Sequence, residues 1–351
     1  MKPPMRRNAR AVQIVSAIAL FASAGRISAQ QNAGYAESSP LRLEPTCSVS
    51  PVSSSCLQLD NGKIELMHVQ GNVYMIAGAG ANISVQIGDK SVLLVDTGNG
   101  QASDKVLTAI RALTNKPILF IASTSPDEDN TGGNASIANA GSALPNAFAT
   151  DPSIVAAGVK MTSGAPIFAQ FNVLGRMSAA GQKEEALPTD TYETDSWRFY
   201  NGESIYLFHA TGHTDGDSIV LFRGSDVIST GDLYNPLISY PIVDTKKGGS
   251  LDGIVDGLNQ IVELMVAKED EEGGTYVIPG HGPISDRNDV VNYRDMVTIL
   301  RARIASLVKK GMTLEQVKAA RPTLDYDGIG NYGATKDVFI EGVYQDLKTK
   351  K

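Results

Sequence analysis

The chain has 351 residues, enough for one large domain with a substantial buried core. Hydrophobic residues make up 42% of the sequence and charged residues 20%, as is usual for a globular protein rather than a disordered or fibrous one. The formal net charge of −7 argues against nucleic-acid binding, because binding to phosphate backbones requires an excess of Lys and Arg.

Residues 1–29 have the pattern of a secretory signal peptide. Basic residues come first, at Lys2, Arg6, Arg7 and Arg10. The apolar stretch Ala11–Ala24 then has the length of a signal-peptide core, and small residues favour cleavage after Ala29. With Arg26, the segment carries five basic residues and no acidic one, so its removal changes the net charge from −7 to −12. We therefore predict an exported protein, periplasmic or extracellular, with no membrane span after cleavage.

Residues 30–60 are rich in Ser, Pro and Gln, which is typical of a linker. They contain the only two cysteines, Cys47 and Cys56. In an exported protein these cysteines can form one local disulfide; the alternative is a pair of free thiols. Metal binding by the pair is not expected, since no His or third Cys lies nearby. We expect one folded domain over residues 61–351.

Short apolar runs predict four strands at the start of this domain. They are Lys63–His68, Val73–Ile76, Ile83–Ile87 and Val92–Val95. A helix with Ser103 as its N-cap should follow, with Val106, Leu107, Ile110 and Leu113 on its buried face. The next apolar run, Ile118–Ala122, reads as a buried strand.

The loop Ser123–Asn134 is the most distinctive stretch of the chain. It holds three consecutive acids, Asp127 to Asp129, before the pair Gly132–Gly133, and Asn134 is placed to cap a helix. It thus joins a strand to a helix at the carboxyl end of the strand, where the active and binding sites of open α/β sheets lie. Taken alone, the loop is better interpreted as a polar turn with a helix cap.

A second helix is expected at Pro152–Met161, after Asp151. The stretch Thr162–Thr189 has no clear period. Its large apolar residues fit the packing of a core: Phe168, Phe171, Val173, Leu174 and Met177. Further strands are predicted at Trp197–Phe199, Ser204–Phe208, Ser218–Phe222, Val227–Ile228 and Thr275–Ile278. Helices are predicted at Leu251–Val266, Val290–Val308 and Val338–Leu347, and a capping box at Thr313–Gln316 begins a short helix.

Three later loops resemble the acidic loop in following a strand and containing glycine. They are Thr211–Ser218, Ser229–Leu233 and Ile278–Pro283. Together with Val95–Gly98, their order and spacing resemble the metallo-β-lactamase superfamily from about Lys63 to the C-terminus. The resemblance implies a four-layer αβ/βα sandwich, an α/β fold in which two mixed sheets are flanked by helices. It also implies that the stretch Thr162–Thr189 lies over the mouth of the active site, so its large apolar residues could line that mouth as an alternative to core packing.

The first motif departs from the family pattern T-H-x-H-x-D-H-x-G-G-N. Aligned on Gly132–Asn134, the sequence has Ser125, Asp127 and Asn130 at the three histidine positions and keeps Asp129. The ligand positions of the later motifs are intact, as His213, Asp232 and His281. The residue matching Asp96 is structural in the family, so we do not predict it to be a ligand. His68 and His209 lie outside such loops and read as ordinary strand residues.

The alignment implies two adjacent metal positions. The first would have Asp127, His213 and Asp232, and the second Asp129, Asp232 and His281. Three carboxylates would then meet without Lys or Arg in the motif loops, and a bound cation is the simplest compensation. Such an oxygen-rich set suits zinc less well and makes manganese or iron(II) competitive. Ser125 and Asn130 could add weak oxygen ligands or hydrogen bonds, and the second position, which keeps more family ligands, is the better candidate.

The resemblance implies metal-dependent hydrolysis of an ester, lactone, amide or lactam bond in a small molecule, with Asp129 orienting or deprotonating the attacking water. Two alternatives stay open at this point. The altered first motif could mark a catalytically inactive relative that uses its cleft for binding. A more remote alternative is metal-free acyl transfer with Ser125 as nucleophile and His213 as base, although no nucleophile-elbow motif surrounds Ser125.

Overall fold

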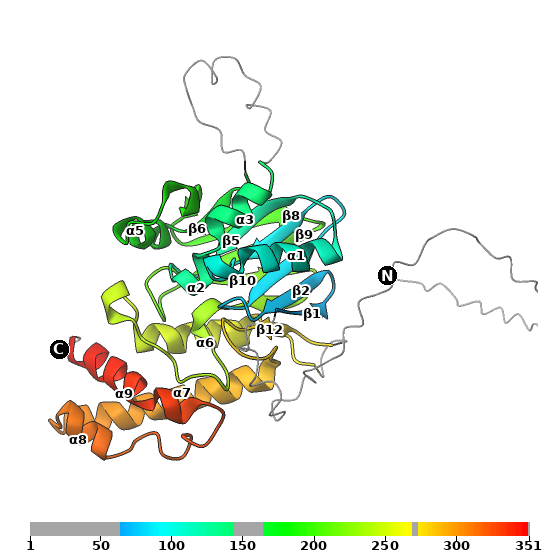
Figure 1. The fold of residues 1–351 in the computed structure, drawn as a ribbon. Helices are drawn as coiled ribbons and strands as arrows, with labels where there is room; N and C mark the ends of the chain where they lie inside the picture. The colour runs from blue at the N-terminus through cyan, green and yellow to red at the C-terminus, as the bar shows by residue number, and fades with distance from the viewer. Residues whose placement is uncertain (1–63, 144–163, 269–272, 350–351) are drawn as a thin grey trace, which may run out of the picture. The chain divides into compact units, whose positions relative to one another are not determined.

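Alternating apolar residues along the strands build two β-sheets that pack face to face. The computed structural model describes residues 64–143, 164–268 and 273–349. The first sheet has the strand order β1-β2-β3-β4-β5-β6-β7. Figure 1 labels β1, β2, β5 and β6 of this sheet. Its strands are β1 (Glu65–Gln70), β2 (Val73–Ala77), β3 (Ile83–Ile87), β4 (Val92–Val95), β5 (Ile118–Ser123), β6 (Ile167–Gln170) and β7 (Asp190–Tyr192).

The sheet is mixed. Strands β1 to β4 form an antiparallel meander, whereas β4, β5, β6 and β7 run parallel to one another. The change occurs where helix α1 (Ser103–Leu113) connects β4 to β5, because a parallel pair needs a crossover connection. The loops after β4 and β5 therefore emerge at the same edge of the sheet, and this edge carries the acidic loop.

The second sheet has the order β12-β11-β10-β9-β8. Its strands are β8 (Asp195–Tyr200), β9 (Glu203–Ala210), β10 (Asp217–Phe222), β11 (Val227–Ser229) and β12 (Tyr276–Ile278). All neighbours pair antiparallel except β11 and β12, which are parallel. The connection between β11 and β12 contains the 3₁₀ turns η5 (Gly231–Leu233) and η6 (Thr245–Lys247) and helix α6 (Leu251–Leu264).

The space between the two sheets is filled by side chains from both inner faces. Phe120 and Phe168 of the first sheet meet Leu207, Val220 and Phe222 of the second in one buried cluster. At roughly 25 cal/mol per Å² of apolar surface removed from water, such large side chains contribute much of the stabilisation of a sandwich.

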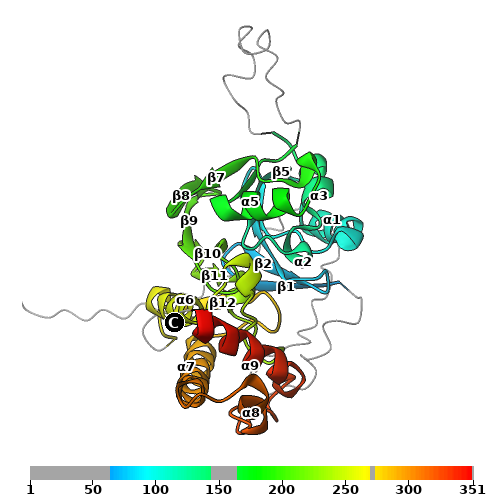
Figure 2. The ribbon, with the colours of Figure 1, turned by 90° about the vertical axis from the view of Figure 1, so that its left-hand side faces the viewer.

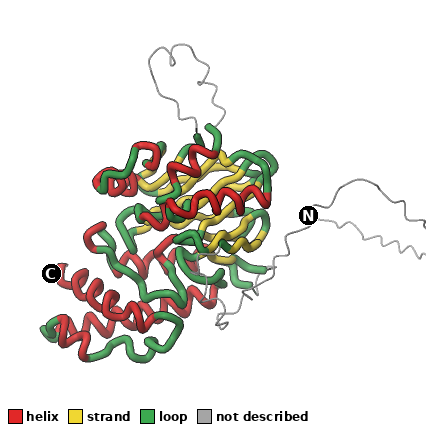
Figure 3. Tube along the Cα trace, viewed as in Figure 1, coloured by secondary structure: helices red, strands yellow, loops and turns green. Residues whose placement is uncertain are grey.

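Helices cover the two outer faces. Val106 and Ile110 of α1 and Ile137 of α3 (Asn134–Ala140) pack on the first sheet. On the second sheet lies a larger cluster from α6, α7 (Arg287–Lys309) and α9 (Tyr332–Thr349). Figure 2 shows these helices on opposite sides of the paired sheets, and Figure 3 shows the strands between them. The layers are αβ/βα, as predicted. The remaining elements are η2 (Gly100–Ala102), α2 (Glu128–Thr131), α5 (Phe171–Ala179), η4 (Glu184–Ala186) and α8 (Leu314–Ala319).

Most predicted elements are present, with ends shifted by a few residues. Two predicted helix caps are wrong. Ser103 is the first residue of α1, because the turn η2, capped by Asn99, precedes it. Asn134 is likewise the first residue of α3, and its buried amide accepts a hydrogen bond from Thr97 Oγ1 at 2.8 Å. The capping box at Thr313 is confirmed.

The irregular stretch before β7 contains β6 and α5. Phe168, Val173 and Met177 are buried in core clusters, so their predicted alternative role at the mouth of a site is wrong. Phe171 is exposed. The predicted signal peptide, the two cysteines and the helix Pro152–Met161 lie outside the described residues. Among the described residues, no helix is both long and apolar enough to cross a membrane.

Candidate functional site

Asp96 fixes the beginning of the acidic loop. Its buried carboxylate accepts hydrogen bonds from the backbone N–H and the hydroxyl of Thr124, at 2.8 and 2.6 Å. Burial raises the pKa of Asp96 to about 8, against the effect of these two hydrogen bonds. Asp96 thus joins the end of β4 to the end of β5 and has the structural role that was expected.

The short helix α2 directs two aspartates toward different partners. Asp127 is the N-cap residue of α2, and Asp129 lies in its first turn. The Oδ2 atom of Asp127 lies 2.5 Å from His213 Nε2, and the Oδ2 atom of Asp129 lies 2.9 Å from His281 Nε2. Because Asp127 and Asp129 are two residues apart on one helical turn, their side chains point to different histidines and belong to two neighbouring groups.

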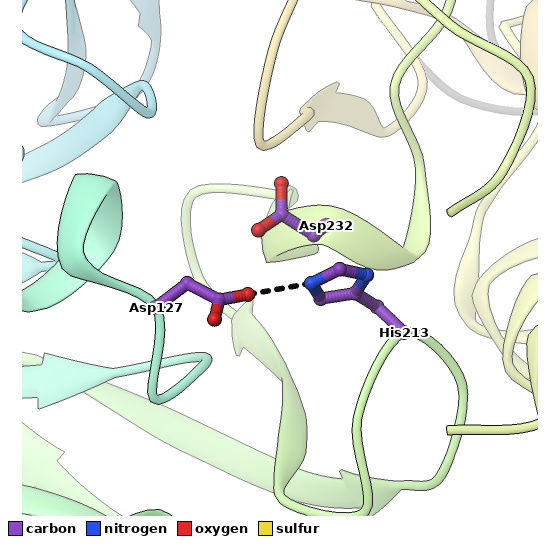
Figure 4. A group of neighbouring side chains, drawn as sticks. All are labelled: Asp127, His213 and Asp232. Atoms are coloured by element: carbon purple, nitrogen blue, oxygen red, sulfur yellow. Dashed lines mark hydrogen bonds and ion pairs between the residues drawn. The ribbon is translucent and has the colours of Figure 1, made fainter. Parts of the chain in front are cut away.

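Asp127, His213 and Asp232 form the first group. Their side chains lie together in Figure 4, and one candidate ligand atom from each lies within 4.8 Å of the others. The other ring nitrogen of His213, Nδ1, contacts the carbonyl oxygen of Ile242 at 2.8 Å. Because a carbonyl and a carboxylate oxygen both accept, His213 can satisfy both contacts only as a doubly protonated ring.

The charges of this first group favour the doubly protonated state of His213. Burial by itself lowers the pKa of His213, but the hydrogen bond to Asp127 and the nearby carboxylates outweigh burial and raise it to about 10. Burial likewise raises the pKa of Asp127, yet hydrogen bonds from His213 and Lys247 outweigh it and hold that pKa well below its usual range. The pair is therefore an imidazolium and a carboxylate at neutral pH.

Lys247 is the residue that the sequence interpretation missed. Its ammonium group forms an ion pair with Oδ1 of Asp127 and lies 3.2 Å from Oδ2 of Asp244. A basic residue from outside the motif loops therefore compensates one of the three carboxylates, so a bound cation is not the only compensation. Lys247 belongs to η6, outside every motif loop, so inspection of those loops alone could not reveal it. The pair Gly248–Gly249 directly after it was the available signal of a close backbone approach.

Asp129, Asp232 and His281 form the second group, again with one candidate ligand atom each within 4.8 Å of the others. His281 Nε2 lies 2.9 Å from Asp129 and 3.6 Å from Asp232. The side chains of Asp129 and His281 are 43% and 30% exposed. The hydrogen bond from His281 outweighs burial and lowers the pKa of Asp129. The two groups contain the same residues that the alignment assigned to two metal positions.

Ser125 and Asn130 are buried next to these two groups but belong to neither of them. Ser125 Oγ lies 3.3 Å from Oδ2 of Asp127, as a hydrogen-bond donor. The amide nitrogen of Asn130 lies 3.3 Å from Thr124 Oγ1, and its buried Oδ1 has no hydrogen-bond partner among the described residues. Both side chains therefore support the acidic loop through hydrogen bonds.

Asp217, at the start of β10, shapes the loop that carries His213. Its carboxylate accepts hydrogen bonds from the Thr214 N–H and hydroxyl and from the Gly212 N–H. Burial raises the pKa of Asp217 to about 7. His209, in contrast, contacts the carbonyl of Asp215 from its strand and takes no part in either group.

The two groups differ in how well they suit a divalent ion. In the first group, Asp127 already has an ammonium group on one oxygen and an imidazole on the other. In the second, two carboxylates and one imidazole converge on an accessible side of the protein. Three protein ligands with an open position are the arrangement of catalytic metal sites. The second group therefore fits an ion, whereas the first group, as arranged here, does not.

A separate cavity of about 220 Å³ lies beyond the loops that carry Asp232 and His281. Tyr234, Tyr293, Tyr332, Pro283 and Met296 are among its lining residues. The hydroxyl groups of Tyr234 and Tyr293 hydrogen-bond to Ser285 and to the Ser239 carbonyl. None of the candidate ligands lines this cavity, so it is not part of the site described above.

The coupling between His213 and Asp127 predicts a pH dependence of stability in metal-free protein. The folded state binds the His213 proton with a pKa of about 10, against 6.5 for an ordinary histidine. The resulting stabilisation is complete below about pH 6.5 and disappears as the pH rises toward 10. Urea unfolding in chelator should show that His213→Gln costs on the order of 3 kcal/mol at pH 6 and much less at pH 10. His68→Gln, at an exposed strand position, is the control. A cost of His213→Gln that stays constant over this range would contradict the assignment.

Comparison with known proteins places this geometry in a known fold. No protein-family model matches the chain, and no curated protein sequence matches it. Among solved structures, a metallo-β-lactamase from Pontibacter korlensis is similar, with 14% identity and a TM-score of 0.50. That alignment covers 67% of this chain and 99% of the other.

The stereoselective inverting sec-alkylsulfatase Pisa1 from Pseudomonas sp. is also similar, with 16% identity and a TM-score of 0.63. The alignment covers 83% of this chain and 51% of the alkylsulfatase, so this chain spans about half the length of that protein. At such identities the likeness concerns the fold, which hosts more than one reaction. The described part of the chain has the metallo-β-lactamase fold.

Proposed function

We propose that the protein is a hydrolase of an ester, lactone, amide or lactam bond in a small molecule, working with a divalent ion at Asp129, Asp232 and His281. The observation that carries this proposal is the convergence of these three side chains within 4.8 Å at a partly exposed position. The metallo-β-lactamase fold supports a hydrolase, because its solved relatives include a β-lactamase and a sulfatase.

The donor set favours an ion that accepts oxygen ligands. Zinc remains compatible with two carboxylates and one imidazole, and manganese and iron(II) suit such a mixture equally well. An ion of this kind, when bound, lowers the pKa of water and polarises a substrate carbonyl. His281 and the two aspartates would hold it, since His281 Nε2 lies 2.9 Å from Asp129 and 3.6 Å from Asp232.

The chain's own residues supply orientation and charge. Asp129 has an exposed carboxylate whose lowered pKa makes it a weak base, so its part is to orient the attacking water by accepting a hydrogen bond. The Lys247 side chain is 37% exposed, and its ammonium can donate a hydrogen bond to a substrate oxygen. His213 is buried with both ring nitrogens engaged, so it holds its proton and fixes Asp127.

The metal-free alternative is not supported by the geometry. A nucleophilic serine requires a histidine that accepts its proton. Here Ser125 donates toward Oδ2 of Asp127, and His213 Nε2 contacts that same oxygen. Both nitrogens of His213 are already engaged, so neither is free to act as the base for Ser125.

A catalytically inactive binding protein is the second candidate. It is favoured by one observation, the pairing of Asp127 with Lys247 and His213, which neutralises the first group without any ion. The two candidates differ in their requirement for metal, since only the hydrolase needs an ion in the second group.

Metal binding to the second group should stabilise the fold by mass action. We expect the melting temperature of chelator-treated protein to rise on addition of manganese, iron(II) or zinc, and hydrolysis of an ester, lactone, amide and lactam panel to appear with it. Asp232→Ala and His281→Ala should abolish both effects, whereas His68→Ala should preserve them. These two substitutions should also remove tightly bound metal from the purified protein, so elemental analysis provides a third readout. If no ion shifts the melt or accompanies the purified protein, the binding-protein candidate replaces the hydrolase.

We also propose that the protein is exported, on the evidence of the basic and apolar order of residues 1–29. Protein from the native host should then begin at Gln30 and contain a disulfide between Cys47 and Cys56. Intact-mass spectrometry with and without reduction measures both. A chain that retains Met1 would refute export, and two thiols that react with an alkylating agent before reduction would refute the disulfide alone.

A further inference from the structure

We propose that the ammonium group of Lys247 is a built-in substitute for a metal ion in the first group, so that the site takes one divalent ion rather than two. This inference rests on the proposed function for the single ion of the second group. The role of Lys247 itself depends only on the contacts of the chain.

The backbone around Lys247 is fixed against the loop that carries His213. The carbonyl of Lys247 accepts a hydrogen bond from the Asp215 N–H at 3.0 Å. The N–H of Asp244 donates to the carbonyl of His213 at 3.0 Å, and the N–H of Ser250 donates to that of Gly212 at 2.8 Å. The backbone of Lys247 is therefore held in place, because residues before and after it in the chain form hydrogen bonds with the loop that carries His213.

Two glycines permit this approach. Gly248 ends the turn with a φ of 77°, a left-handed conformation that favours glycine. A Cβ atom on Gly249 would lie 2.1 Å from the carbonyl oxygen of His213, which is far too close for any other residue. The sequence Lys-Lys-Gly-Gly before the N-cap Ser250 is thus suited to placing a lysine directly beside His213.

The contacts of Asp127 leave no oxygen for an ion in this arrangement. Oδ1 pairs with the Lys247 ammonium, and Oδ2 lies 2.5 Å from His213 Nε2 and 3.3 Å from the Ser125 hydroxyl. The opposite ring nitrogen of His213 contacts the carbonyl of Ile242. An ion could enter only by displacing Lys247 and taking the ring nitrogen from Asp127.

The second group lacks such a substitute. Among the described residues, neither Asp129 nor Asp232 forms an ion pair with Lys or Arg, and His281 is the basic residue that lies between them. The Asp127 carboxylate, whose side chain is 14% exposed, is thus balanced by a monovalent cation of the chain, while the carboxylates of Asp129 and Asp232 both face His281. This unequal distribution of charge is what limits the site to one divalent ion.

Metal stoichiometry tests the proposal. Equilibrium dialysis of chelator-treated protein against manganese, followed by elemental analysis, should give one ion per wild-type chain. Lys247→Met, which keeps an unbranched side chain one atom shorter and removes its charge, should bind two. Lys247→Arg should return to one, and Lys246→Met, at the exposed neighbouring lysine, should also give one. Two ions in the wild type, or one in Lys247→Met, would overturn the proposal.

A double-mutant cycle in chelator separates this proposal from the proposed function. Lys247→Met and Asp127→Asn, alone and together, should show a coupling of at least tenfold in the unfolding equilibrium constant at pH 7. Coupling below twofold would overturn the role of Lys247, whatever the metal content. If no variant binds manganese but the coupling is present, the metal-dependent hydrolase fails and Lys247 keeps its place as the cation of the first group. Should Lys247→Met fold poorly, Lys247→Gln replaces it in both measurements.

Discussion

The site depends on one constraint, the need to neutralise the carboxylate of Asp127 where it is withdrawn from water. An unpaired charge at such a position costs several kcal/mol, so a cation must accompany it. In this chain the cations are Lys247 and protonated His213, one on each carboxylate oxygen. Their presence changes the meaning of the altered first motif, because the loss of histidines there does not by itself require a metal ion in compensation.

The rest of the fold serves to bring these groups to one edge. The parallel pairing of β4 with β5 places Asp96 next to Thr124, and this contact sets the direction of the loop into α2. On the other sheet, the parallel pairing of β11 with β12 brings the loops of Asp232 and His281 together. The two sheets meet through their apolar inner faces, and the two halves of the site meet with them.

Much of this arrangement could be predicted from the sequence, because the motif loops follow apolar strands in a fixed order. The two groups of three residues and the layer order follow from that pattern, and the strands Ile83–Ile87 and Val92–Val95 have their predicted ends. The caps at Ser103 and Asn134 were mispredicted, since a short turn or a buried hydrogen bond alters the local role of a polar residue. Lys247 was missed because its side chain arrives from a turn outside the motifs, and pairing across the chain is not visible in local spacing.

The fold alone does not determine the reaction, since proteins of this architecture have different activities. The reaction must therefore be inferred from the residues of the site. We propose that one divalent ion and one lysine share a site in which the alignment implies two ions. Anomalous X-ray diffraction from crystals grown with manganese tests this most directly. We expect one manganese peak per chain, between Asp129, Asp232 and His281, with the Lys247 ammonium in contact with Asp127. A second peak between Asp127, His213 and Asp232, with Lys247 turned toward solvent, would contradict it.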